Sequence, residues 1–80
     1  MTAKLLMPKL GLTMTAGTIA QINYKVGDFV KAGEAVMEFE TEKLTEPIVA
    51  PFDGYVVELL AQVDDEIDCG KPVCVFADKL

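Results

Sequence analysis

The sequence contains one internal repeat, and this repeat restricts the chain to a small set of folds. When residues 17–40 are aligned with residues 54–77, an offset of 37 (54 − 17), the two segments match without a gap. The paired positions include Gly17/Gly54, Val26/Val63, Asp28/Asp65, Gly33/Gly70, Val36/Val73 and Phe39/Phe76. Because turn residues and apolar residues recur together, we expect the two segments to share one backbone shape.

The segments on either side of residue 43 have the pattern of β-strands. Residues 35–41 alternate between apolar and polar side chains, with Met37 and Phe39 on the same side, as is typical of a half-buried strand. Residues 44–50 are predicted to form a second strand. Pro47 lies inside it, and since proline cannot donate a hydrogen bond to a neighbouring strand, we expect an edge strand or a bulge there.

Further strands are predicted between turns rich in glycine, proline or aspartate. The predicted strands are residues 2–7, 17–24, 29–30, 54–61 and 73–77. A surface loop is expected at residues 8–16, and turns at 27–28, 32–34, 51–54, 64–66 and 70–72. Two repeats are too few for a solenoid, so we predict an all-β sandwich or flattened barrel in which the two halves pack with pseudo-two-fold symmetry.

The composition excludes several classes of function. The chain has no His, Ser, Arg or Trp, so the usual Ser-His and Cys-His nucleophiles cannot be built. The two cysteines, Cys69 and Cys74, do not have the number or spacing of a zinc site or a C-x-x-C motif, and we interpret them as packing side chains. A net charge of −6 argues against nucleic acid and favours a partner with a basic surface.

The length and hydropathy of the chain indicate one small domain. No segment approaches the ~20 apolar residues that cross a membrane. The first residues also lack the apolar stretch and cleavage site of a signal peptide. We therefore expect a cytoplasmic protein, or part of a larger cytoplasmic chain, with no membrane partner.

Lys43 is the residue at which the repeat loses its symmetry. It lies between two predicted strands, so a hairpin would carry its amine away from the sheet, and the position 37 residues later is the last residue, Leu80. The nearest charged side chains are Glu40, Glu42 and Glu46. This stretch taken alone is consistent with a charged turn that only keeps the hairpin soluble. Its place at the end of the first repeat indicates instead a functional lysine.

With these residues placed, the sequence resembles the lipoyl domains of 2-oxo acid dehydrogenase complexes. The matching features, in order, are Met7-Pro8, Leu10-Gly11-Leu12-Thr13-Met14, Gly17-Thr18-Ile19, Val26-Gly27-Asp28, Ala32-Gly33, Glu40-Thr41-Glu42-Lys43 and Ala50-Pro51 before Gly54. The resemblance implies a single carrier domain over residues 1–80, with its core at residues 4–77. It implies two four-stranded antiparallel sheets, and lipoate in amide linkage to Lys43.

The resemblance also implies recognition residues and partners. The recognition residues around the modified lysine would be Glu40, Thr41, Glu42, Leu44 and Glu46. The family fold would also place the loop of residues 10–16 beside this hairpin. The partners would be a lipoate ligase, a thiamine-diphosphate-dependent 2-oxo acid dehydrogenase component, an acyltransferase catalytic domain and a flavin-dependent dihydrolipoyl dehydrogenase. The domain itself would be a carrier and not an enzyme, within a longer dihydrolipoyllysine-residue acyltransferase chain. Its pattern is more similar to pyruvate or acetoin systems than to 2-oxoglutarate systems.

Some residues depart from the family pattern, and two alternative functions stay open. Glu42 stands where the family usually has Asp, Leu44 where it has a smaller residue, Pro47 where it has a polar one, and Ala16 where it has Glu. One alternative is a biotinyl carrier domain of a carboxylase, which shares the fold but has Met on both sides of its lysine. The other is an unmodified β-sandwich that serves only as an interaction module.

Overall fold

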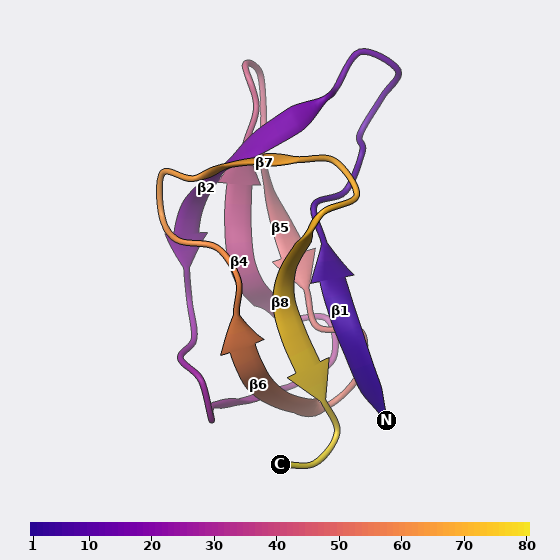
Figure 1. Cartoon of the computed structure of the whole chain (residues 1–80), viewed down its shortest axis with the longest axis vertical. Coiled ribbons are helices and arrows are strands. Elements are labelled where there is room, and N and C mark those ends of the chain that lie inside the picture. Colours follow the sequence, from indigo (N-terminus) through magenta and orange to yellow (C-terminus); the bar gives the residue numbers. More distant parts are fainter.

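A computed structural model describes all 80 residues and consists of eight β-strands without a helix (Figure 1). The strands are β1 (Thr2–Leu6), β2 (Ala16–Ile22), β3 (Phe29–Val30), β4 (Ala35–Glu40), β5 (Thr45–Val49), β6 (Gly54–Leu59), β7 (Glu66–Asp68) and β8 (Pro72–Ala77). They form two four-stranded antiparallel sheets, ordered β1-β8-β6-β3 and β5-β4-β2-β7. The predicted fold class is therefore confirmed. No helix suited to crossing a membrane is present.

The sequence repeat is a repeat of strand pairing. In the first half β2 pairs with β4, with Ile19 opposite Phe39; in the second half β6 pairs with β8, with Val56 opposite Phe76. The short strands are exchanged between the halves, because β3 pairs with β6 while β7 pairs with β2. Each half therefore completes the sheet of the other, and neither sheet is complete without both repeats.

Bulges occur at equivalent places in the two halves and alter the predicted alternation. The register of β4 against β5 shifts between Ala35 and Met37. Because a bulge inserts an extra residue, Val36 and Met37 are both buried, as are their counterparts Val73 and Cys74. The predicted alternation therefore holds from Met37 to Glu40, with Met37 and Phe39 buried on one side, and the bulge at Val36 interrupts it at the start of the strand.

The core lies between the two sheets and is centred on equivalent aromatic rings. Phe39 and Phe76 are fully buried. Gly17 and Gly54 lie against these rings: a Cβ atom at Gly17 would lie 3.0 Å from Cδ2 of Phe39, and one at Gly54 would lie 2.9 Å from Cε2 of Phe76 and collide with the carbonyl oxygen of Ala77. Both halves therefore use glycine where the strand passes closest to the core.

Two local predictions have different outcomes. Residues 64–66 were expected to form a turn only, whereas Glu66 begins β7. The charged side chains of Glu66 and Asp68 hide this strand in the sequence, and only Ile67 packs against the core. By contrast, Pro47 is exposed in β5, which is an edge strand, as predicted.

Candidate functional site

The hairpin that carries Lys43 joins β4 to β5 at one end of the molecule, and both chain termini lie at the opposite end (Figure 1). Residues 41–44 separate the two strands. Glu42, Lys43 and Leu44 are exposed, and Thr41 is half-buried. The lysine thus stands at a tip that projects beyond the sheets, as its position between two predicted strands indicated.

Thr41 closes the turn with its backbone and with its side chain. Its N–H donates to the carbonyl of Leu44 at 2.8 Å, and the N–H of Leu44 donates to Oγ1 of Thr41 at 3.3 Å. In many β-turns a backbone carbonyl accepts this second bond, and a threonine hydroxyl is a known substitute. The two bonds hold Glu42 and Lys43 at the apex, so Thr41 shapes the turn that presents the lysine.

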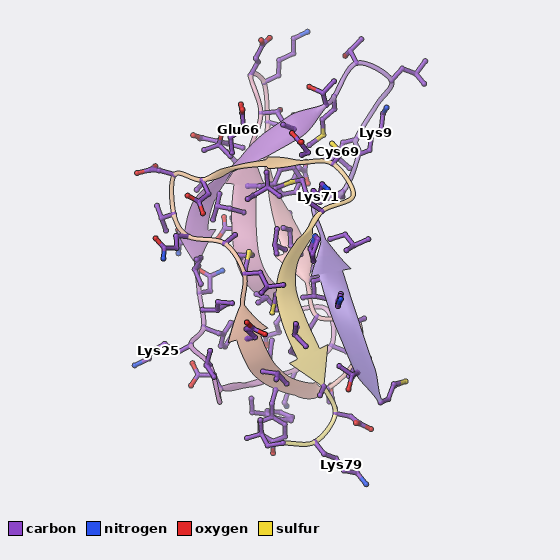
Figure 2. All side chains as sticks on the ribbon, viewed as in Figure 1. Lys9, Lys25, Glu66, Cys69, Lys71 and Lys79 are labelled. Atoms are coloured by element: carbon purple, nitrogen blue, oxygen red, sulfur yellow. The ribbon has the colours of Figure 1, made fainter.

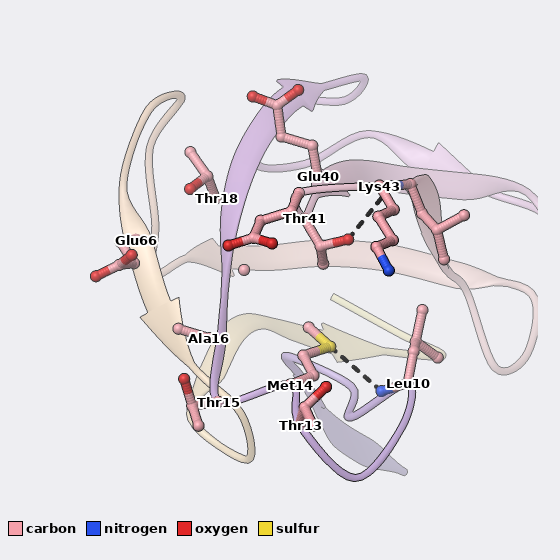
Figure 3. A pocket seen from close by; sticks show the side chains of 13 residues that line it. Leu10, Thr13, Met14, Thr15, Ala16, Thr18, Glu40, Thr41, Lys43 and Glu66 are labelled. Carbon is pink, nitrogen blue, oxygen red and sulfur yellow. Dashed lines mark hydrogen bonds between the residues drawn. The ribbon is translucent and has the colours of Figure 1, made fainter.

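The amine of Lys43 has no partner within the chain. The only ion pair of the structure joins the N-terminal amine to Asp78, at 2.8 Å and at the other end of the molecule. Figure 3 shows the Lys43 side chain extending from the hairpin toward Leu10. An acyl group can therefore approach the amine without breaking a native contact.

A hollow of about 640 Å³ lies beside Lys43, between the hairpin and the connection that leads into β2 (Figure 3). Its lining consists of Leu10 and residues 13–18 on one side, residues 40–44 on the other, and Glu66 of β7. Segments distant in sequence meet here because β2 pairs with β4 on one side and with β7 on the other.

The predicted acidic residues divide into two groups. Thr18 is opposite Glu40 on β4 and opposite Glu66 on β7, so these side chains form one row on the outer face of the sheet. Glu46 pairs with the buried Phe39 instead and is half-buried. Because neighbouring residues of a strand point to opposite faces, Glu46 lies away from Glu40. The hollow is therefore lined by Glu40, Glu42 and Glu66, but not by Glu46.

The connection between β1 and β2, residues 7–15, is held by sulfur atoms and by backbone bonds. The N–H of Leu10 donates to Sδ of Met14 at 3.2 Å. Sγ of Cys69 lies 3.5 Å from the carbonyl oxygen of Pro8 and 3.7 Å from that of Met14, and the N–H of Cys69 donates to Thr15 at 2.9 Å. Both ends of the connection are thus tied to the segment between β7 and β8. Figure 2 shows Cys69 at this junction.

The two cysteines are free thiols with packing contacts. Cys74 is fully buried, and burial raises the pKa of its thiol to about 11. Cys69 is half-buried and makes the loop contacts described above. Neither thiol faces the Lys43 hollow as a lining residue, which agrees with their interpretation as structural side chains.

Comparison with known proteins gives one family and a consistent fold. A biotin/lipoyl family model, described as "Biotin-requiring enzyme", matches residues 3–76. The dihydrolipoyllysine-residue acetyltransferase component of the acetoin cleaving system of Bacillus subtilis (strain 168) is 35% identical over 78 residues, which cover 98% of this chain and 20% of that protein. Other relatives are acyltransferase components of pyruvate and 2-oxoglutarate dehydrogenase complexes.

Two solved structures, one of a lipoyl domain and one of a carboxylase, show the same fold. The solution structure of the lipoyl domain of the 2-oxoglutarate dehydrogenase complex from Azotobacter vinelandii has a TM-score of 0.74 and 22% identity, and the match covers 95% of this chain and 99% of that one. The urea carboxylase of Kluyveromyces lactis has a TM-score of 0.80 and 25% identity, with 96% and 6% covered. The chain spans a fifth or less of the length of the curated relatives named above.

Proposed function

The chain belongs to the biotin/lipoyl family as a lipoyl carrier domain, and we propose that Lys43 is the residue to which the lipoyl group is attached. The observation that carries this proposal is the position of the Lys43 amine, unpaired and exposed at a hairpin tip that the rest of the fold supports. The hairpin lies within the part of the chain that the family model matches. When bound, lipoate supplies a disulfide that accepts and releases acyl groups.

In the attachment reaction the domain supplies the Lys43 amine as the nucleophile and holds it at an exposed turn. It supplies no side chain that catalyses the reaction. The Lys43 nitrogen attacks the acyl carbon of an activated lipoyl group, and an amide bond forms as the bond to the activating group breaks. The nearby titratable side chains are the carboxylates of Glu40, Glu42 and Glu66. The activation, and the base that removes the proton, are assigned to the ligase. Thr41 contributes by fixing the turn.

Biotin is the alternative acyl group, since the fold alone does not distinguish the two cofactors. A carboxylase matches the fold as well as a lipoyl domain does. Lipoate is favoured by the sequence relatives, which are dihydrolipoyllysine-residue acyltransferase components, and by the side chains of Glu42 and Leu44 where a biotinyl domain has methionines. The other alternative, an unmodified β-sandwich that serves only as an interaction module, is disfavoured because these relatives are named for a lipoyl-modified lysine.

The whole protein is proposed to be a dihydrolipoyllysine-residue acyltransferase of a 2-oxo acid dehydrogenase complex, of the pyruvate or acetoin type. The partners of the domain would be the lipoate ligase, the thiamine-dependent component, the acyltransferase domain and the flavin-dependent dehydrogenase. Attachment of the arm to one assembly raises its effective concentration at each active site. Support comes from the acetoin and pyruvate relatives.

The thiamine-dependent partner is proposed to have a basic surface around its active-site entrance, because the net charge is −6 and Glu40, Glu42 and Glu66 surround the hollow. Carboxylates at the tip accelerate encounter with such a surface, and salt weakens this effect. The fully lipoylated Glu40→Gln/Glu66→Gln variant should therefore be acylated more slowly than wild type at low salt. If the variant and wild type are acylated at equal rates at every salt concentration, the partner does not recognise Glu40 and Glu66.

The attachment itself is tested by intact mass spectrometry after incubation with lipoate ligase, lipoate and ATP, and separately with biotin ligase, biotin and ATP. The expected result is one lipoyl group per chain and no biotin. Lys43→Gln should abolish the mass increase. Lys9→Gln, which removes another exposed lysine, should leave it unchanged and serves as the matched control. A lipoyl increment that persists in Lys43→Gln, or modification by biotin alone, would refute the assignment.

A further inference from the structure

The hollow beside Lys43 contains apolar side chains that presentation of the lysine does not require. Leu10 and Leu44 line it with 46% and 49% of their surface exposed, and the half-buried Met14, in the same loop as Leu10, lines it as well (Figure 3). Leu12, in the same loop, is 96% exposed and does not line the hollow. Two exposed leucines thus face a common space next to the amine, whereas a third faces solvent.

We propose that this hollow is a docking site for the lipoyl arm of Lys43 itself, across which the arm folds back when no partner enzyme holds it. The proposal rests on the attachment of lipoate to Lys43. The ligand class is a neutral aliphatic acyl chain that ends in a dithiolane ring. Lys43 lines the hollow, and Figure 3 shows its side chain directed toward Leu10, so an acyl chain bonded to the amine begins at the edge of this space.

The apolar lining is held in place before an arm is present. The backbone N–H of Leu10 donates to Sδ of Met14, so the Met14 side chain is held against the backbone of Leu10. The loop is fixed in turn by the contacts of Cys69 with Pro8 and Met14. A preorganised surface does not lose side-chain entropy again when a ligand covers it.

The tether makes a small contact sufficient. A free ligand loses translational and rotational freedom on binding, whereas an arm already bonded to Lys43 does not lose this freedom again. Hydrocarbon that covers the exposed surfaces of Leu10 and Leu44 is removed from water together with them. The contact is also small enough for a partner enzyme to compete for the arm.

The charges of the lining favour the neutral forms of the arm. Glu40, Glu42 and Glu66 line the hollow, and no cationic side chain does apart from Lys43, which amide formation neutralises. A thiolate would be repelled by these carboxylates, whereas a closed dithiolane or an uncharged dithiol would not. The docked state is therefore assigned to the uncharged arm.

The first test is NMR spectroscopy of the lipoylated domain, with complete modification verified by intact mass. Nuclear Overhauser effects are expected between the methylene protons of the arm and the methyl groups of Leu10 and Met14, and none to Leu12. A full lipoyl mass increment without these contacts would overturn the docking and leave the carrier function intact. Absence of the increment would overturn the carrier function and the docking with it.

The second test uses a matched pair of leucine variants and the rate at which a water-soluble phosphine reduces the dithiolane. If the arm is docked for half the time or more, Leu10→Ser should raise this rate by about twofold or more, because the protected population is lost. Leu12→Ser should keep the wild-type rate. Amide spectra verify that each variant is folded, and Leu10→Ala provides a milder change of the same side chain. Equal rates for wild type and both Leu10 variants would overturn the docking.

Discussion

The two ends of this β-sandwich are built from equivalent strand pairs, yet only one end carries a candidate site. At the Lys43 end, β4 and β5 are joined by the hairpin of residues 41–44, and residues 7–15 lead into β2. At the other end, the equivalent strands β8 and β1 pair in the same way, but the chain termini take the place of the hairpin, and Met1 and Asp78 are bonded across them. The scaffold is symmetric, and its connections are not.

The connections that lead into β2 and β6 explain how the difference arises. Residues 50–53 form a short connection into β6, and its Phe52 ring packs 5.3 Å from that of Phe76. The longer residues 7–15 cannot all pack into the core, and they extend beside the hairpin, where Leu10 lines a hollow. One connection adds to the core and the other builds a surface. The comparison teaches that a duplicated fold acquires a single site through unequal loops.

The largest effect is expected where the two halves are most alike. Phe39→Ala and Phe76→Ala should each lower the free energy of unfolding by about 3–5 kcal/mol, because each leaves a cavity in the core. Phe76→Ala should lie toward the upper end, since it also removes the aromatic contact with Phe52. Chemical denaturation of both variants measures the costs. If either substitution is neutral, the halves do not contribute equivalent core sites.

A smaller and unequal effect is expected at the paired glycines. Added to Gly54, a Cβ atom collides with the backbone carbonyl of Ala77, whereas at Gly17 it meets the flexible side chain of Met7 at 2.9 Å. Overpacking of this kind costs about 1–3 kcal/mol, and Gly54→Ala should be the more destabilising of the two. Thermal melts of Gly17→Ala and Gly54→Ala compare them directly. The reverse order would show that the backbone at Gly54 adjusts more readily than Met7.

Much of the symmetric scaffold could be predicted from sequence, because its signals are local and occur twice. The alternation that ends in Phe39, the recurring glycines and the place of Lys43 between two strands led to the fold and to the hairpin. The strand β7 could have been found from its counterpart Phe29–Val30, but the charges of Glu66 and Asp68 hid it. An internal repeat can therefore reveal a strand that the local sequence pattern alone does not predict.

The hollow could not be predicted, because it depends on contacts between distant segments. Glu66 reaches Glu40 only through the pairing of β2 with both neighbours. The family resemblance implied that the loop of residues 10–16 lies beside the hairpin, but not that Cys69 ties this loop to the segment before β8. No sequence spacing encodes these meetings. Of the acidic residues predicted near Lys43, Glu40 and Glu42 line the hollow and Glu46 does not, while Glu66 was not predicted.

The smallest effect on stability is expected at the functional residue. Lys43→Gln should change the free energy of unfolding by no more than about 0.5 kcal/mol, since an exposed turn side chain without partners contributes little. Thr41→Val should cost more, because it removes the hydroxyl that accepts the N–H of Leu44 while preserving the shape of the side chain. Melting curves of both variants measure whether Thr41 stabilises the turn while Lys43 does not. A marked loss of cooperativity in Lys43→Gln would make the lysine structural.

The central claim, that a symmetric scaffold presents one lysine for modification, is tested most directly by mapping the modified site. The chain has seven lysines, since it contains seven basic residues and no arginine. Tandem mass spectrometry of peptides from the fully lipoylated domain measures the occupancy of each. The predicted result is complete occupancy of Lys43 and none at the other six. A lipoyl group on any other lysine, with Lys43 unmodified, would contradict the account.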